Sequence, residues 1–144
     1  MINFIEREMT SAEYELVKIG FDTNSKDNGN SVETSERIGF VSIEEGDFIG
    51  CSSGLATKNG DVYNGWFYLT DLYVEKLYRK KGYGKVLLEN LENKIRSLGI
   101  KSIWTWTAGY EAQAFYRKQG YDIFAEFRDW YATGHSRFGL WKHL

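Results

Sequence analysis

The chain has 144 residues, of which 42% are hydrophobic and 26% charged, and its net charge is −2. These values fit one globular domain over residues 1–144, and the slight negative charge argues against nucleic acid as a partner. No apolar run reaches the length of a membrane span and the N-terminus lacks a signal-peptide pattern, so we expect a cytoplasmic protein with no membrane partner.

The first half of the chain predicts one helix and a pair of hairpins. Helical spacing begins after Thr10 and Ser11, either of which can cap a helix over residues 11–18. The polar stretch 24–31 is typical of a surface loop. The segments that follow predict strands at residues 37–44, 48–56 and 66–74, with turns at residues 45–47 and 58–61.

The second half predicts alternating helices and strands. Apolar residues at helical spacing indicate a long helix over residues 83–98, and Gly99 stands where such a helix would end. The remaining elements are expected as a strand at residues 100–107, a helix at 111–119, a strand at 121–130, and a strand at 137–142 that closes the sheet. This order indicates an α/β (α+β) fold, in which a mixed sheet has helices packed on its faces.

A basic, glycine-containing segment lies between the aromatic strand and the long helix. It reads Arg79-Lys80-Lys81-Gly82-Tyr83-Gly84-Lys85. The N-terminus of a helix presents N–H groups without internal partners, and these favour an anion such as a pyrophosphate. Val86 excludes a P-loop, and Leu87 at the third glycine position excludes a dinucleotide-binding fingerprint. A solvated basic patch is the alternative interpretation of these residues alone.

Two motifs resemble those of the GNAT superfamily of N-acetyltransferases. The sequence Arg79-x-x-Gly82-x-Gly84 is similar to the family motif R/Q-x-x-G-x-G/A, and it follows Leu72-Tyr73-Val74. The sequence Phe115-Tyr116-x-x-x-Gly120-Tyr121 is similar to the second family signature, F-Y-x-x-x-G-F/Y. The match extends over residues 66–144, and residues 1–65 agree only in element order. The resemblance implies a GNAT-like acyl-CoA N-acyltransferase fold, with a mostly antiparallel sheet and a central parallel pair of strands that splay apart.

The same resemblance implies acetyl-CoA as the acyl donor and no metal. In such enzymes the strand before the phosphate loop bulges, and its backbone groups at Leu72 and Val74 would bind the pantetheine and the thioester. The residues implied in cofactor binding are Leu72, Tyr73, Val74, Arg79, Lys80, Lys81, Gly82, Tyr83, Gly84, Lys85 and Phe115. An asparagine often opens the second motif, and Gly109 takes that position here, which leaves open whether cofactor binding is weakened.

Tyr116 and Asp71 are the candidate catalytic residues. Tyr116 would protonate the departing thiolate, with a structural role in the core as the alternative. The acceptor amine must lose a proton, and Asp71 is the nearest acidic candidate for the base, with Tyr68 and a water as another route. Strict alternation would place Tyr68, Thr70 and Leu72 on one face of the strand and Leu69, Asp71 and Tyr73 on the other, unless a bulge resets the register.

The acceptor pocket is less well defined by the sequence. Its candidate walls are Trp66, Trp104, Trp106 and Trp130, with Glu126 or Asp129 attracting a cation, and each of these has an ordinary core or surface role as the alternative. Direct attack by an amine needs no enzyme nucleophile, so Cys51 is interpreted as a small buried apolar residue. His135 and His143 have no metal-ligand spacing.

The leading hypothesis is an acetyl-CoA-dependent N-acetyltransferase acting on a primary amine, with a small-molecule amine favoured. The alternatives are a non-catalytic acyl-CoA-binding or regulatory domain, an acetyltransferase for protein N-termini or lysines, and a nucleic-acid module using residues 79–85. The sequence identifies neither the acceptor nor the base. GNAT-like proteins are often dimers, which makes a homodimer a further expectation.

Overall fold

The computed structural model describes residues 1–144, except for the side chains at positions 110 and 111. By its internal contacts the chain divides into two units, Met1–Glu33 and Thr34–Leu144. Its helices are α1 (Ser11–Asp27), α2 (Tyr83–Ser97) and α3 (Gly109–Lys118), with a 3₁₀ turn, η1 (Lys76–Tyr78). Its strands are β1 (Glu33–Glu44), β2 (Asp47–Asn59), β3 (Val62–Val74), β4 (Ser102–Ala108), β5 (Asp122–Phe127) and β6 (Arg137–His143).

The first unit is built around α1, which begins at a capping box. The Thr10 side chain accepts a hydrogen bond from the Glu13 N–H, and the Glu13 carboxylate accepts one from the Thr10 N–H. Of the two caps predicted, Thr10 and Ser11, the structure therefore has Thr10. The helix continues to Asp27, so the prediction of a loop from residue 24 is wrong. The end of the longer helix is satisfied locally, because the Asn28 side-chain amide donates to the carbonyl of Asn24.

The second unit contains a six-stranded sheet in the order β1-β2-β3-β4-β6-β5. Only the pairing of β3 with β4 is parallel among the strand pairs whose register is described, and the others are antiparallel. This arrangement confirms the predicted mixed sheet with a central parallel pair. The turn between β1 and β2 is formed by Glu45 and Gly46, whose φ values of 49° and 89° suit a two-residue hairpin turn.

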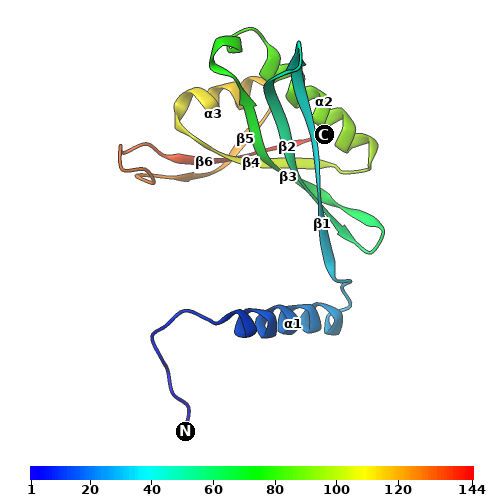
Figure 1. Ribbon diagram of the computed structural model, residues 1–144, viewed down its shortest axis with the longest axis vertical. Helices are drawn as coiled ribbons and strands as arrows, with labels where there is room; N and C mark the ends of the chain where they lie inside the picture. The colour runs from blue at the N-terminus through cyan, green and yellow to red at the C-terminus, as the bar shows by residue number, and fades with distance from the viewer. The chain divides into compact units, whose positions relative to one another are not determined.

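The sequence analysis predicted that the last strand closes the sheet at its edge, and this prediction is wrong. β6 lies between β4 and β5 and pairs antiparallel with both, so β5 is the edge strand (Figure 1). The residues of β6 explain this position, because Phe138, Gly139 and Leu140 are buried as a central strand requires. β5 in contrast is mostly exposed, which is typical of an edge.

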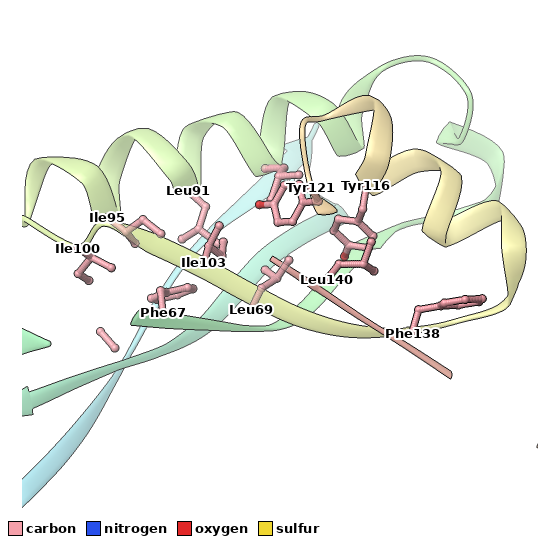
Figure 2. Close-up of a cluster of buried hydrophobic side chains, with 12 residues drawn as sticks. Phe67, Leu69, Leu91, Ile95, Ile100, Ile103, Tyr116, Tyr121, Phe138 and Leu140 are labelled. Atoms are coloured by element: carbon pink, nitrogen blue, oxygen red, sulfur yellow. The ribbon is translucent and has the colours of Figure 1, made fainter. Parts of the chain in front are cut away.

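Helices α2 and α3 pack on the same face of the sheet. Buried residues of α2, such as Leu88, Leu91 and Ile95, meet Phe67 and Leu69 of β3 in one apolar cluster (Figure 2). Tyr116 of α3 and Tyr121 belong to the same cluster, and their ring centroids are 5.3 Å apart. We call this side the helix face of the sheet, and the other side, which carries Trp66 and Trp104, the aromatic face.

A buried ionic group connects α2 to β6 beneath the helix face. Glu92 is only 4% exposed, and its carboxylate accepts hydrogen bonds from Lys142 Nζ at 2.8 Å and from the Tyr121 hydroxyl at 3.0 Å. No buried side-chain polar atom lacks a partner in the described part of the chain. In that same part, no helix has the length and apolarity needed to cross a membrane.

Candidate active site

The site begins at a bulge in β3. Ser53 of β2 pairs with Asp71, but the next residue, Gly54, pairs with Leu69, so Thr70 is an extra residue on β3. A bulge of this kind turns the residues beyond it to the opposite faces. Leu72 accordingly packs against the core on the helix face. The strict alternation of side chains, which would put Leu72 on the same face as Tyr68, therefore holds only up to the bulge. Beyond it the register is reset, as the sequence analysis allowed.

β3 and β4 diverge immediately beside the bulge. Their register pairs are Trp66 with Ser102, Phe67 with Ile103, and Tyr68 with Trp104. One residue further along, the hydroxyl of Thr105 donates to the carbonyl of Leu69 at 2.9 Å, in place of a backbone bond. Past this contact neither strand has a register partner in the other. We call this point, at Tyr68, Leu69, Trp104 and Thr105, the vertex of the splay.

The divergence leaves backbone groups of β3 without a neighbouring strand. The Glu75 N–H donates to the carbonyl of Ile49 at 2.7 Å, so the peptide groups of Glu75 face β2. Residues of an antiparallel ladder face the neighbour alternately, and the register is continuous from Asp71 to Val74. The peptide groups of Leu72 and Val74 therefore point to the open side. The Val74 carbonyl is already used there, because it accepts a hydrogen bond from Arg79 Nε at 2.8 Å.

The loop after β3 has two residues in the left-handed region. Gly82 has a φ of 88°, which glycine adopts without steric cost, and Lys80 has a φ of 61°, which costs a lysine about 1 kcal/mol or more. A turn of this kind directs successive N–H groups into one concave surface. The conformational role predicted for Gly82 agrees with this geometry.

Helix α2 starts without a cap. Gly82 is its N-cap residue and provides no side-chain hydrogen bond, whereas α1 has a complete capping box. The first intrahelical donor is the Val86 N–H, which bonds the carbonyl of Gly82. The N–H groups of Tyr83, Gly84 and Lys85 therefore have no partner within the helix, and an anion placed there would satisfy them.

A cavity of about 460 Å³ lies over this helix end. That volume is within the range of small-ligand sites. Eight of the eleven residues predicted to bind the cofactor line it together with two others, the full set being Val74, Tyr78, Arg79, Lys80, Gly82, Tyr83, Gly84, Lys85, Phe115 and Gln119. Leu72, Tyr73 and Lys81 are not among the lining residues.

The eight predicted residues on the cavity wall are joined by two that the sequence analysis missed, Tyr78 and Gln119. Tyr78 lies in η1 and Gln119 directly follows α3, so each reaches the cavity from an element boundary that no motif marks. Gly84 lies on its floor, where an added Cβ would stand 3.7 Å from Val74 and 3.8 Å from Phe115. A larger side chain at this position would extend into the space above.

Most basic side chains of the loop already have partners within the protein. The Arg79 guanidinium also stacks over the Tyr73 ring at 5.7 Å, and Lys81 Nζ lies 5.6 Å from the Tyr78 ring centroid. Lys85 is 3.8 Å from Glu89, in an exposed pair of little energetic weight. These contacts position the loop, and they leave its main chain as the principal source of donors for an anion.

Tyr116 is placed beneath the vertex. Its side chain is 7% exposed and does not line the cavity, whereas its neighbour Phe115 does. Burial raises the pKa of Tyr116 to about 12, and an interaction of its hydroxyl with the Thr105 side chain opposes that shift in part. Because Thr105 also bonds Leu69, the hydroxyl of Tyr116 lies one side chain away from the point where β3 and β4 separate.

Asp71 lies on the aromatic face, in a polar cluster next to the bulge. Its carboxylate accepts hydrogen bonds from the Thr70 hydroxyl at 2.6 Å and from Arg37 Nη2 at 3.0 Å. Arg37 comes from β1, and the same nitrogen also contacts Ser53 Oγ at 3.0 Å. Arg37 was not predictable as a partner of Asp71, because more than thirty residues separate the two along the chain.

Other residues considered from the sequence have less direct positions. Cys51 is half-buried, and its pKa is raised, mainly by burial and then by the charge of Asp71. Gly109 begins α3 with a φ of 74°, in a region that glycine and asparagine adopt most readily, which explains why either residue type suits this position. In the described part of the chain, no three His, Cys, Asp or Glu side chains are grouped to hold a metal ion.

Comparisons with known proteins agree with this geometry. A family model described as the acetyltransferase (GNAT) family matches residues 3–121. L-ornithine N5-acetyltransferase NATA1 of Arabidopsis thaliana is 31% identical over 70 residues, which cover 47% of this chain and 31% of that protein. The chain thus spans about a third of that relative's length.

Solved structures have the same fold. An acetyltransferase from Bacillus cereus ATCC 14579 superposes with a TM-score of 0.80 at 25% identity, over 99% of this chain and 98% of that chain. An aminoglycoside 6'-N-acetyltransferase complexed with coenzyme A superposes with a TM-score of 0.63 at 20% identity, over 75% of this chain and 73% of that chain. Since the family model matches well over half of its residues, this chain belongs to the GNAT family of acetyltransferases.

Proposed function

We propose that this protein transfers the acetyl group of acetyl-coenzyme A to the primary amine of a small molecule, by direct attack of the amine on the thioester. The observation that supports this most strongly is the uncapped N-terminus of α2, which lies at the end of a strand with open backbone groups and beneath a cavity of about 460 Å³. Anion-binding donors and an open strand edge together suit a long ligand with a phosphate end and an amide-containing arm.

The proposed cofactor contacts follow from these positions. The N–H groups of Tyr83, Gly84 and Lys85 would bind the pyrophosphate, with Lys80 contributing charge from the cavity wall. The N–H of Val74, together with the N–H and the carbonyl of Leu72, would bind the pantetheine arm along the open edge of β3. Tyr73, Arg79 and Lys81 would act mainly by holding the loop in place. Arg79 contacts the Tyr73 ring and the Val74 carbonyl, and Lys81 contacts the Tyr78 ring.

The bound thioester supplies an activated acetyl group, and the surrounding residues manage two protons. An alkyl amine with a pKa of about 10.4 is protonated at neutral pH and must lose a proton before it attacks. Asp71 is the proposed acceptor of that proton, directly or through water, and Arg37 orients its carboxylate. As the carbon–sulfur bond breaks, Tyr116 is the proposed donor of a proton to the sulfur.

The preference for a small acceptor is supported by the curated relative, which is named for ornithine. The solved structures with this fold are divided, because one is named for an aminoglycoside and another for the alanine of ribosomal protein S18. We also propose, from the sequence alone, that the protein is a single domain, is located in the cytoplasm and forms a homodimer.

A transfer assay with a panel of amines tests the proposal. Acetyl-coenzyme A and each amine are incubated with the protein, and a thiol-reactive dye detects the released coenzyme A. We expect release that depends on a small primary amine. Binding of coenzyme A without any amine-dependent release would favour a non-catalytic domain, and release with peptides alone would favour a protein acetyltransferase. Steeply salt-dependent binding to DNA or RNA, unaffected by coenzyme A, would favour a nucleic-acid module.

A further inference from the structure

A row of aromatic side chains crosses the aromatic face from the vertex to the edge of the sheet. The register pairs Tyr68 with Trp104, Trp104 with Trp141, and Trp141 with Asp122, across β3, β4, β6 and β5. Directly paired residues place their side chains on the same face. The row therefore starts at the splay and ends at a carboxylate.

Four rings near this row enclose a hollow. A cavity of about 290 Å³ is lined by Trp66, Trp104, Phe124 and Trp141. The Trp66 and Trp141 ring centroids are 5.7 Å apart with the planes tilted by 45°, and Trp104 meets Phe124 at 6.4 Å and 69°. Rings inclined in this way surround a space instead of stacking to fill it. Of the four tryptophans that the sequence suggested for an acceptor pocket, only Trp66 and Trp104 line this hollow.

The backbone of β6 is adapted to this arrangement. An added Cβ at Gly139 would lie 2.6 Å from the Phe124 ring and 2.9 Å from the Trp106 ring. Glycine at this position therefore allows the Phe124 ring to lie over the strand and form one wall of the hollow. Phe124 itself is the extra residue of a bulge in β5, because Ile123 pairs with Leu140 and Ala125 with Gly139.

The charge around the hollow favours a cation. The Asp122 side chain is exposed and makes no hydrogen bond or ion pair within the described part of the chain, so its carboxylate is available. The π faces of tryptophan attract cations, most strongly where water is partly excluded. The same face already binds one, because the Arg137 guanidinium lies 5.0 Å from the ring centroids of both Trp106 and Trp130. Glu126, an earlier candidate for attracting a cation, instead accepts a hydrogen bond from Ser136.

We propose that this hollow binds a second ammonium group of the acceptor, so that the preferred substrates are diamines or related polyamines. The inference rests on the proposed function, in which one amine reacts at the splay. The cofactor cavity involves the helix face through Val74 and Phe115, whereas the hollow lies on the aromatic face. An acceptor anchored in the hollow approaches the vertex from the side opposite to the cofactor, along the row that begins at Tyr68.

Binding of a cation to the hollow is tested without coenzyme A. The full-length protein is titrated with diaminobutane and, separately, with butanediol, a neutral molecule of the same length, while the tryptophan indole N–H resonances are followed by NMR. We expect saturable shifts of the Trp104 and Trp141 signals with the diamine only. Equal responses to both compounds, or no response to the diamine, would overturn the proposal.

Two variants connect the hollow to substrate choice. In the wild type, kcat/KM for diaminobutane should exceed that for n-butylamine by about three- to thirtyfold, the range expected of a cation–π site. Trp141→Leu should remove this preference, whereas Trp130→Leu, on the same face but outside the hollow, should keep it. Asp122→Asn, at an exposed position with little effect on folding, should weaken diamine binding by about two- to fivefold.

The outcomes separate the two proposals. If both amines are acetylated equally well, or if Trp141→Leu and Asp122→Asn leave the diamine preference unchanged, the hollow is not an acceptor subsite although the acetyltransferase function stands. If the diamine shifts the indole signals but no amine is acetylated, the cation site stands and the proposed function fails.

Discussion

At the scale of single residues, the proposed acid has an unusual environment. Tyr116 is buried within the core cluster, and its hydroxyl interacts with Thr105, which lies at the vertex. Because burial raises its pKa to about 12, the hydroxyl stays protonated well above neutral pH, as an acid must. The motif around Tyr116 predicted its role from the sequence, but Thr105 could not be predicted, since one threonine in an apolar strand gives no signal.

Tyr116→Phe should lower kcat by about 10²-fold and leave coenzyme A affinity nearly unchanged, because Tyr116 does not line the cofactor cavity. Steady-state kinetics and calorimetry measure the two effects. Tyr63→Phe is the matched control, since its hydroxyl bonds Glu36 near the far end of β3. In the wild type, Tyr116 should cause no loss of kcat between pH 7 and 10, because its pKa of about 12 keeps the hydroxyl protonated over that range. An unchanged kcat in Tyr116→Phe would remove the residue from the mechanism.

The buried pair of Glu92 and Lys142 also acts at the residue scale, through stability. Lys142→Met removes the cation but leaves the carboxylate of Glu92 buried, which should destabilise the protein by about 3 kcal/mol. Changing both residues, as in Glu92→Gln with Lys142→Met, should cost clearly less than the sum of the single changes, because neither then leaves a charge unpaired. Urea unfolding measures all three variants. Additive costs would show that the pair is not coupled.

At the scale of elements, the bulge in β3 depends on the close approach of β2. An added Cβ at Gly54 would overlap the carbonyl oxygen of Tyr68 and the Phe67 ring, directly beside Thr70. Glycine therefore lets β2 pass close to the point where β3 changes register. Once this register change is made, Leu72 and Val74 belong to the helix face and Asp71 to the aromatic face, so the bulge puts the residues proposed for the cofactor and for the acceptor on opposite sides.

Gly54→Ala should lower the free energy of unfolding by about 2 kcal/mol or more and weaken coenzyme A binding, because β3 must shift away from β2 at the bulge. Thermal or urea denaturation and calorimetry provide the two measurements. Gly65→Ala, in the neighbouring strand β3 with no atom near the added Cβ, is the control and should be nearly neutral. A tolerated Gly54→Ala variant with full cofactor affinity would contradict the role given to this contact.

The elements also show what the sequence can and cannot predict. The helical spacing before Gly99 and the turn at Glu45 and Gly46 are local signals, and the structure confirms both. The position of β6 between β4 and β5 was not predictable, because strand order depends on contacts between distant segments. The full length of α1 was missed for a different reason: its last turn is polar, and polar side chains are typical of loops as well as of exposed helices.

At the scale of the whole second unit, one splayed sheet separates the two cavities proposed as ligand sites. The cavity at the start of α2 is lined by residues of α2 and α3, and the hollow of Trp66, Trp104, Phe124 and Trp141 lies on the aromatic face. Direct transfer requires both substrates to be bound at once and to meet at one point. The gap between β3 and β4 provides that point, because no backbone ladder closes it beyond the vertex.

Calorimetric titration with coenzyme A, compared with pantetheine, tests most directly whether the N-terminus of α2 binds a pyrophosphate. We expect coenzyme A to bind at least about a hundredfold more tightly, because pantetheine lacks the phosphates that the free N–H groups would bind. Gly84→Val should abolish this advantage by filling the floor of the cavity, and Gly65→Val should retain it. Equal affinity for the two ligands, or no heat with saturating coenzyme A, would contradict the account.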